Sequence, residues 1–294
     1  MTGAGGLIGS HTVKFLRENG YPVLALYRRL DEPDSKKPWD TIQGDLVHDT
    51  TIQALDRIRF DLAVHCAAVF PDQFYGAYAE QVARTNLLID ERMLDLCAKK
   101  RAHLIYISSS GVYGSGDGSL LAEDAALSPI GPYLRAKVRS ESRILQELPL
   151  SSTVLRISAP YGPGQRTRTV LRIFIERCLA GLDLMYHGSG RRQQDFTAAD
   201  DVAGAIGAVC TSGANGVFNI AGGNPICMRD LAELVIQAIP ETKSKVLPSG
   251  QPDPQEDYRA AFDISKARRV LDWYPTILLK EGIRQWTEYL RGKT

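Results

Sequence analysis

The sequence predicts an α/β protein with a doubly wound parallel sheet and a smaller C-terminal lobe. A glycine-spaced turn opens the chain, and apolar strand-like runs alternate with helical patterns up to about residue 160. After residue 161 the pattern changes to shorter elements and turns rich in Gly and Pro. Strands that alternate with helices favour a parallel sheet covered by helices on both faces. We therefore expect a sheet domain at residues 1–160 and a second lobe at 161–294, with some elements of that lobe returning to the sheet.

The first element is the turn that contains Gly3, Gly6 and Gly9. This spacing lets the backbone turn tightly, approach a pyrophosphate and pack a helix on the sheet, and the helix N-terminus offers free N–H groups. Glycines at this spacing also occur in ordinary turns, so the motif alone only indicates a dinucleotide cofactor. A strand of about six residues normally precedes such a turn. We expect this first strand to be absent, because Met1 cannot supply it: either the natural start lies upstream or another segment fills the place.

The remaining elements follow in a regular order. Residues 11–19 carry apolar side chains at Val13, Phe15 and Leu16 and end at Gly20, which predicts a helix with a glycine stop. In the first half we expect buried strands at 21–27, 61–66, 103–108 and 153–157, and helices at 81–99 and 133–148. In the second half we expect helices at 170–180, 200–210, 229–238 and 281–291, and a polar surface loop at 249–256.

Composition limits the partners of the chain. Its 294 residues are 44% hydrophobic and carry a net charge of +1, which gives no electrostatic case for nucleic acid or an anionic membrane. No apolar run approaches the roughly 18 residues of a membrane helix, and no signal peptide is evident. The five cysteines are scattered without a Cys-x-x-Cys pair, and the histidines lack the spacing of metal ligands. We expect reduced cysteines, no protein-bound metal and a cytoplasmic location.

A second constellation combines serines, a tyrosine and a lysine. Tyr133 and Lys137 are four residues apart, which places a phenol and an ammonium on one face of the predicted helix. The serine cluster at 108–110 closes an apolar strand, at the edge where parallel sheets bind ligands. Each feature alone is common, as a tyrosine beside a solvated lysine or as serines in a turn. The glycine turn, the serines and the Tyr-x-x-x-Lys pair in this order are far less common together.

The chain thereby resembles the extended short-chain dehydrogenases/reductases of the NAD-dependent epimerase/dehydratase family, along nearly its whole length. The resemblance implies a Rossmann-like NAD(P)-binding domain at 1–160 and a mainly substrate-binding lobe at 161–294. The positions that carry it are the turn at 2–9, Gly44-Asp45-Leu46, His65-Cys66-Ala67-Ala68, Asn86, the stretch 108–114 ending in Val112-Tyr113-Gly114, Tyr133 with Lys137, the stretch 156–164, Asp195-Phe196, Asp201-Val202, Phe218-Asn219-Ile220 and the stretch 271–275.

The resemblance implies catalytic roles for three residues. Tyr133 would exchange a proton with a substrate hydroxyl or carbonyl while hydride passes to or from the nicotinamide. Free tyrosine has a pKa of about 10, so the phenolate needs the positive charges of Lys137 and the oxidised nicotinamide beside it. Ser109 would hydrogen-bond the reacting oxygen. The implied cofactor site consists of Gly3, Gly6, Leu7, Ile8, Gly9, Arg28, Arg29, Asp45, Leu46, Ala67, Ala68, Asn86, Ser108, Tyr133, Lys137 and Pro160.

The choice between NADP and NAD depends on the end of the second strand. An acidic residue there would bind the ribose hydroxyls of NAD, whereas arginine would meet the 2′-phosphate of NADP. The strand ends in Arg28 and Arg29, which favours NADP, and Asp31 is close enough to keep NAD open as the alternative.

Substrate chemistry is narrowed by a residue that is missing. Relatives that are 4,6-dehydratases carry an acidic residue between the catalytic hydroxyl and the Tyr-Gly, where this chain has Ser110 and Gly111. The resemblance therefore implies an epimerase or a ketoreductase, two alternatives that stay open, and not a dehydratase. A non-catalytic NAD(P)-binding sensor or scaffold is a third class, which the intact catalytic residues disfavour.

A nucleotide sugar is the substrate that the resemblance favours, and a small ketone or hydroxy compound is the alternative. Many relatives bind the substrate diphosphate with two arginines, but this chain has Gln194 at the first position and no arginine at 252–257. Arginines can bind a diphosphate from several directions. The residues expected to contact the substrate are Ser110, Arg166, Arg168, Arg191, Arg192 and Arg259. Family members often form homodimers through the helices at 81–99 and 133–148, and we expect the same here.

Overall fold

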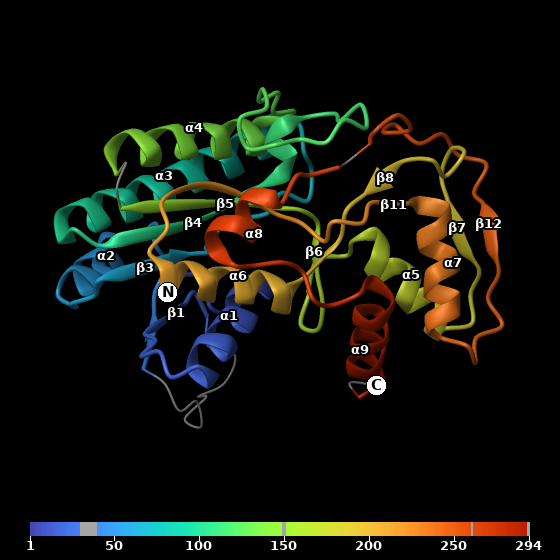
Figure 1. The fold of residues 1–294 in the computed structure, drawn as a ribbon, viewed down its shortest axis with the longest axis horizontal. Helices are drawn as coiled ribbons and strands as arrows, with labels where there is room; N and C mark the ends of the chain where they lie inside the picture. Colours follow the sequence, from blue (N-terminus) through green and yellow to red (C-terminus); the bar gives the residue numbers. More distant parts are fainter. Residues whose placement is uncertain (30–39, 149–150, 260, 293–294) are drawn as a thin grey trace.

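The fold is built on a parallel sheet covered by helices (Figure 1). The computed structural model describes residues 1–29, 40–148, 151–259 and 261–292. Parallel strands form the main sheet in the order β10-β5-β4-β3, and β1 pairs in parallel with β2. The bounds are Ala25–Tyr27 for β1, Thr41–Gln43 for β2, Leu62–His65 for β3, His103–Ser109 for β4, Ser152–Ile157 for β5 and Gly216–Ile220 for β10.

The first residues of the chain lie between β3 and β1. The Met1 carbonyl accepts a hydrogen bond of 2.8 Å from the Leu26 amide, and the Thr2 amide donates one of 2.9 Å to the Val64 carbonyl. We predicted that Met1 could not supply the central strand, and the structure corrects this: residues 1–4 satisfy backbone groups on both neighbours at the end of the strand next to the glycine turn. The sheet therefore continues from β3 through residues 1–4 to β1 and β2, in the order of a doubly wound sheet.

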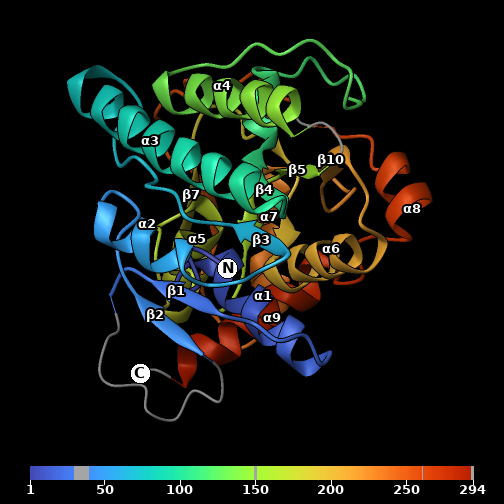
Figure 2. The same cartoon turned by 90° about the vertical axis from the view of Figure 1, so that its left-hand side faces the viewer.

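Helices cover both faces of this sheet (Figure 2). α3 and α4 pack together on one face beside α2, whereas α1 and α6 pack together on the other beside α8. Alternation along β4 directs Leu104 and Tyr106 into the core under α3 and α4, and Ile105 and Ile107 into the core under α6. The bounds are Leu7–Glu18 for α1, Asp49–Asp56 for α2, Gly76–Lys100 for α3, Pro132–Glu147 for α4, Ala199–Ser212 for α6 and Ser265–Leu271 for α8.

A second group of elements packs around its own apolar core beside the sheet. Tyr161, Phe174 and Trp286 are among the largest side chains of this core. Its strands form separate two-stranded pairs, with β6 parallel to β9, β7 parallel to β12, and β8 antiparallel to β11. The bounds are Pro160–Tyr161 for β6, Val170–Leu179 for α5, Leu184–Tyr186 for β7, Gln193–Gln194 for β8, Thr197–Ala198 for β9, Ile226–Cys227 for β11, Met228–Ala238 for α7, Val246–Pro248 for β12 and Leu279–Arg291 for α9.

The structure also shows which membrane-spanning helices, metal-ligand clusters and disulfides the described residues could form. In the part of the chain that the structure describes, no helix has the length and apolarity to cross a membrane. No cluster of three or more metal-ligating side chains occurs among the same residues. All five cysteines are free, and burial raises the pKa of the Cys66 thiol to about 12. Asp31, the residue that kept NAD open, lies outside the described residues.

Candidate active site

The glycine turn forms a cradle that only glycine fits. Gly3 has a φ of +68°, and a Cβ there would meet the Ala67 amide nitrogen at 2.6 Å. A Cβ on Gly9 would meet the Gly3 carbonyl oxygen at 2.0 Å. α1 starts at Leu7 with Gly6 as its N-cap, and no side chain caps its first N–H groups. The turn therefore presents open backbone donors and a positive helix end, which fits the pyrophosphate of a dinucleotide.

The loop after β3 lies beside this cradle and is held by Asn86. The Asn86 side chain accepts a hydrogen bond of 2.8 Å from the Val69 amide and donates one of 2.9 Å to the Val69 carbonyl. Ala67 is half-buried and Ala68 is exposed, so their backbone can border a bound cofactor. Asn86 supports the loop that carries Ala67 and Ala68, because its side-chain amide bonds to Val69. Its predicted contact with the cofactor stays a prediction.

A hollow of about 700 Å³ lies at the ends of β1 and β2. Exposed Arg28 and Arg29 line one side, and Asp45 lines another. The Asp45 carboxylate accepts a hydrogen bond of 3.1 Å from the Val47 amide, while Leu46 is buried in the core. The hollow therefore offers two cations at the place where a doubly wound sheet binds the adenosine end of its cofactor.

The three serines at the end of β4 and the start of the next turn have different surroundings. Ser108 is buried and donates a hydrogen bond to Glu141, and its predicted contact with the cofactor stays a prediction. Ser109 is half-buried and accepts a hydrogen bond of 3.1 Å from the Gly111 amide. Ser110 is buried at the start of the 3₁₀ turn Ser110–Tyr113. Only Ser109 of the three combines partial exposure with the predicted catalytic position.

The tyrosine and lysine of α4 are brought beside the end of β4. A Cβ on Gly111 would meet both the Leu134 side chain at 3.0 Å and Ser109 Oγ at 3.3 Å, so Ser109 lies next to the first turn of α4. Tyr133 is half-buried, and the edge of its ring packs against Phe70 at a centroid distance of 5.6 Å. Among the described residues its hydroxyl has no hydrogen-bond partner, so it is available to a substrate.

Lys137 lies one turn deeper in α4 and is 4% exposed. Its ammonium donates hydrogen bonds of 3.0 Å to the Tyr106 hydroxyl and 2.9 Å to the Ile107 carbonyl. The structure thus places Ser109, Tyr133 and Lys137 at the end of β4 and the start of α4, as the sequence predicts. Two hydrogen bonds hold the Lys137 ammonium, whereas the Tyr133 hydroxyl has no partner among the described residues.

Sequence reasoning missed the polar groups behind Lys137. Tyr106 donates a hydrogen bond of 2.6 Å to Asp90, which lies on the buried face of α3. His65, at the end of β3, contacts the same carboxylate at 2.9 Å. Tyr106 and His65 each place a polar group within an apolar strand, which is a sequence signal for a buried polar network. Asp90 gives no such signal, because in the sequence it resembles a solvated helix carboxylate.

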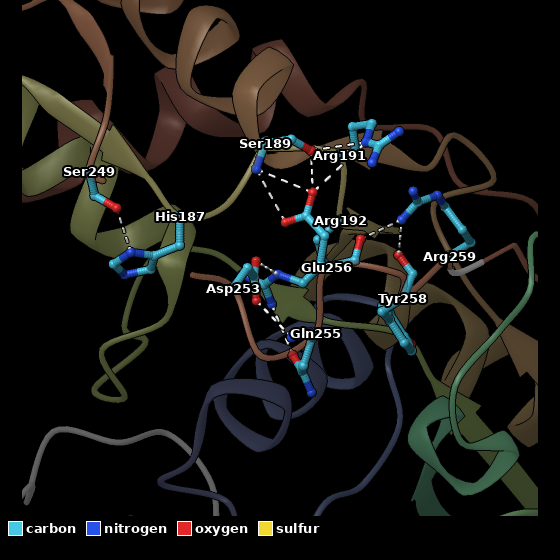
Figure 3. Close-up of polar contacts among 10 residues, drawn as sticks. All are labelled: His187, Ser189, Arg191, Arg192, Ser249, Asp253, Gln255, Glu256, Tyr258 and Arg259. Atoms are coloured by element: carbon cyan, nitrogen blue, oxygen red, sulfur yellow. Dashed lines mark hydrogen bonds and ion pairs between the residues drawn. The ribbon is translucent and has the colours of Figure 1, made fainter. Parts of the chain in front are cut away.

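In the second lobe, two of the predicted substrate arginines line one pocket (Figure 3). Arg191 and Arg259 border a cavity of about 340 Å³ together with Gln193, Ile226 and Asp230. The Arg191 side chain is 70% exposed and donates a hydrogen bond of 2.9 Å to Ser189 Oγ. Arg259 donates hydrogen bonds through Nη1 to the Glu256 and Tyr258 carbonyls, at 2.8 and 3.1 Å.

Arg192 does not share this pocket. Its Nε donates a hydrogen bond of 2.9 Å to Asp253 and its Nη1 donates one of 3.1 Å to Gln255 (Figure 3). The Asp253 side chain is almost fully buried. Residues 249–256 form a mostly exposed loop, as the sequence predicts, and Asp253 of this loop pairs with Arg192. The predicted role of Arg192 as a substrate ligand stays a prediction.

The remaining predicted residues lie between β6 and α5. Pro160 is half-buried in β6, where it pairs with Thr197. Arg168 is exposed and lies 3.5 Å from Glu176 of α5. Neither Arg166 nor Arg168 belongs to the lining of the pocket beside Arg191 and Arg259.

A doubly wound sheet with a glycine cradle and a Ser, Tyr and Lys set at its edge defines an oxidoreductase of the extended short-chain dehydrogenase/reductase type. The sequence profile of the NAD dependent epimerase/dehydratase family matches residues 1–221. The chain belongs to this family, as the resemblance indicated.

Known relatives match the chain over nearly its whole length. The dTDP-glucose 4,6-dehydratase of Actinoplanes sp. is 29% identical, with 99% of this chain and 97% of the relative covered. The UDP-glucose 4-epimerase of Mycolicibacterium smegmatis is 27% identical, with 100% and 98% covered. Both reaction types therefore occur among the similar proteins.

Solved structures also match this chain over nearly its whole length. A UDP-glucose 4-epimerase with UDP-glucose from Thermotoga maritima superimposes with a TM-score of 0.87 at 27% identity, covering 99% of this chain and 98% of that chain. MoeE5 in complex with UDP-glucuronic acid and NAD gives 0.87 at 28% identity, with 100% and 98% covered.

Proposed function

We propose that the protein is an NAD(P)-dependent nucleotide-sugar epimerase or 4-ketoreductase that transfers hydride at a sugar carbon. The observation that carries this proposal is the convergence of an open Tyr133, a half-buried Ser109 and a buried Lys137 at the carboxyl edge of the sheet. A sensor or scaffold needs no group for proton transfer at this place. A homodimer and a cytoplasmic location stay predictions.

The residues of the site divide the work. A bound nicotinamide supplies the hydride acceptor or donor. Tyr133 takes the proton from a substrate hydroxyl, or returns it to a carbonyl, through its unpartnered oxygen. Ser109 donates a hydrogen bond to the same substrate oxygen and stabilises its developing charge. Lys137 has one donor left beyond Tyr106 and Ile107, and this donor holds the cofactor ribose and favours the phenolate of Tyr133.

The residues after β4 support the exclusion of a dehydratase. Elimination of water requires an acid and a base in addition to the tyrosine. Ser110 and Gly111 fill that place, and Leu134 packs directly over Gly111. The buried carboxylate of Glu141, on α4, is engaged by Ser108 and Arg156. The similarity to dehydratases over the full chain makes this exclusion the point that most needs a test.

NADP is the cofactor that we favour, because Arg28 and Arg29 face the hollow at the ends of β1 and β2. Two guanidinium groups suit a 2′-phosphate and give no advantage to a bare ribose. We expect replacement of both by alanine to weaken NADPH binding at least about tenfold while NADH binding changes little. Arg59→Ala, an arginine that does not line the hollow, is the control.

A nucleotide sugar suits the pocket that Arg191 and Arg259 border, since two guanidinium groups can bind a diphosphate. One observation favours the alternative of a small ketone. The Arg192–Asp253 pair places a buried carboxylate in the lobe where relatives carry a diphosphate arginine, so fewer cations face the substrate than in those relatives.

A product assay separates these reactions. Purified protein is incubated with NADPH or NAD⁺ and a panel of UDP- and dTDP-sugars, their 4-keto derivatives and small ketones, and products are identified by proton NMR. We expect inversion at one sugar carbon without net cofactor use, or reduction of a 4-keto sugar with stoichiometric NADPH use. A 4-keto-6-deoxy product would overturn the exclusion of a dehydratase, and turnover of small ketones alone would overturn the nucleotide-sugar assignment.

A further inference from the structure

A continuous chain of buried polar groups runs from Lys137 to the glycine turn. Lys137 donates to the Tyr106 hydroxyl at 3.0 Å, and that hydroxyl donates to Asp90 Oδ2 at 2.6 Å. Asp90 Oδ1 lies 2.9 Å from His65 Nε2, and His65 Nδ1 lies 2.7 Å from the Thr2 hydroxyl. The proposed reaction uses only Lys137 and gives no role to the other side chains of this hydrogen-bonded series.

The protonation states of this chain follow from its surroundings. Burial of Tyr106, with the charge of Asp90 beside it, raises the pKa of its phenol well above the usual range, so the hydroxyl keeps its proton. Burial alone would raise the pKa of Asp90, but the charge of Lys137 and the hydrogen bonds from His65 and Tyr106 together lower it. A buried carboxylate and a buried ammonium are thus joined by one neutral hydroxyl.

This order fixes the direction of each hydrogen bond. Because the Tyr106 O–H donates to Asp90, its lone pair faces Lys137 and accepts from the ammonium. The Ile107 carbonyl accepts a second hydrogen, at 2.9 Å. Ser140, one turn after Lys137 on α4, also donates to Asp90, at 2.7 Å, and ties the helix to the same carboxylate. The third hydrogen of Lys137 is then held in one direction.

We propose that Asp90 is a positioning residue for Lys137, acting through the hydroxyl of Tyr106 and providing the buried counter-charge of the ammonium. This role rests on the proposed function, in which Lys137 holds the cofactor and the phenolate of Tyr133. Asp90 contacts neither, since it lies on α3 behind β4. A buried aspartate without hydrogen-bond partners would lower the stability of the fold. The full set of partners of Asp90 offsets this cost.

Charged and titratable groups face Asp90 from several sides. His65 comes from β3, Tyr106 from β4, and Lys137 and Ser140 from α4. Glu91 and Arg143 border a gap of about 10 Å³ beside it on the outer side. Removal of this negative charge lowers the proton affinity of every titratable group nearby, so the whole profile of kcat against pH should move to lower pH.

The test compares Asp90→Asn, Tyr106→Phe and the double variant in the reaction that the product assay identifies. We expect each single variant to lower kcat on the order of tenfold to 100-fold with little change in KM, because a displaced lysine misplaces the transition state. The double variant should be no worse than either single one, since both break the same path. Asp90→Asn should also move the kcat profile down by about one pH unit.

Two comparisons separate positioning from a general loss of structure. Asp95→Asn removes an exposed carboxylate from the same helix and should leave kcat and the profile unchanged. In a Lys137→Ala background, Asp90→Asn should cause no further loss of kcat, because the group on which it acts is gone. An equal loss in that background, or an unshifted profile, would overturn the proposal. Should Asp90→Asn fail to fold, Tyr106→Phe, which keeps the ring, still decides the question by the same background test.

Failure of this proposal is distinguishable from failure of the proposed function. Titration with NADPH and NAD⁺ is followed by quenching of protein fluorescence, which needs no substrate. If Lys137→Ala leaves cofactor affinity and turnover intact, the proposed function is wrong. If Lys137→Ala weakens both while Asp90→Asn and Tyr106→Phe weaken neither, only the positioning role is wrong.

Discussion

At the scale of single residues, the site depends on contrasting environments within one turn of α4. Tyr133 is half-buried with an unpartnered hydroxyl in the described part of the chain, whereas Lys137 is buried with two fixed acceptors. The tyrosine can therefore meet a substrate while the lysine stays in place. This contrast leads to different expectations for substitutions at the two positions.

Tyr133→Phe should lower kcat by about 10²- to 10⁴-fold, because it removes the proton path and little else. Cofactor affinity should stay nearly unchanged, since the ring and its contact with Phe70 remain. Steady-state kinetics and NADPH titration measure the two effects. Tyr274→Phe, at a tyrosine that is 52% exposed, is the control. A large loss of cofactor affinity in Tyr133→Phe would contradict the assigned role.

The proposed catalytic set follows from local signals in the sequence, and the roles of its residues stay predictions. Helix spacing alone puts Tyr133 and Lys137 on one face of α4, and the serines mark the end of a recognisable strand. The partners of these residues were not predictable in the same way. Glu141 for Ser108, Asp90 for Tyr106 and Asp253 for Arg192 come from distant parts of the chain. Each of these carboxylates resembles a solvated surface charge until the fold places it against its partner.

At the scale of elements, the long helices and the buried strands of the first half were predicted, whereas β10 of the second half and the short elements were not. α2 and α8 have only eight and seven residues, too few for a clear apolar period. β1 begins at Ala25 and not at residue 21, because the Tyr21 amide bonds back to Leu16 and Pro22 has no amide hydrogen. α3 begins at Gly76, before its apolar pattern starts, so periodicity placed its start too late.

The close backbone packing at the start of α1 leads to a prediction for Gly9. Gly9→Ala should abolish cofactor binding and lower the free energy of unfolding by about 1–3 kcal/mol, because the new Cβ collides with backbone. Gly5→Ala is the matched control in the same turn, since its Cβ would meet only the Tyr27 ring at 3.4 Å. Chemical denaturation and NADPH titration of both variants give the comparison. Equal behaviour of the two would show that the cradle is not constrained as described.

The contact between α1 and α6 should make stability depend on pH. His11 of α1 lies 2.5 Å from Asp200 of α6 and also contacts the Pro163 carbonyl. Burial of the ring alone would lower the pKa of His11, but these hydrogen bonds and the Asp200 charge raise it above 6.5. The stabilisation is thus complete below about pH 6.5 and is lost as the pH rises through the raised pKa.

His11→Gln should therefore lower the melting temperature at pH 5.5 more than at pH 9. The free energy of unfolding that His11→Gln removes should differ between the two pH values by less than about 1 kcal/mol, because the Asp200 side chain is half exposed. Thermal unfolding across this pH range measures it, with His187→Gln as the control, since the His187 ring hydrogen-bonds only to Ser249 among the described residues. A difference that grows with pH would have the wrong sign for this contact.

At the scale of the whole molecule, the proposed function assigns different parts of the reaction to the sheet edge and to the second lobe. The order β10-β5-β4-β3 with residues 1–4 and β1-β2 brings the glycine cradle and the serine, tyrosine and lysine to one edge. β10 returns from the second half to pair with β5, as Figure 2 shows. Side chains of β8, β11 and α7 border the arginine pocket together with Arg191 and Arg259. This division supports redox chemistry on the sheet side and substrate selection on the lobe side.

The most direct test of the central claim follows the hydride itself. UDP-glucose and UDP-glucuronic acid carrying deuterium at sugar C4 are mixed with the protein and NADP⁺ or NAD⁺, and mass spectrometry locates the label. We predict that in the wild type deuterium is found on the nicotinamide ring, or back at C4 of a sugar whose C4 configuration is inverted, and that Tyr133→Phe gives neither result. Deuterium that stays at C4 of both sugars with the configuration unchanged and never appears on the ring, although cofactor and sugar are bound, would contradict hydride transfer at this nucleotide-sugar carbon.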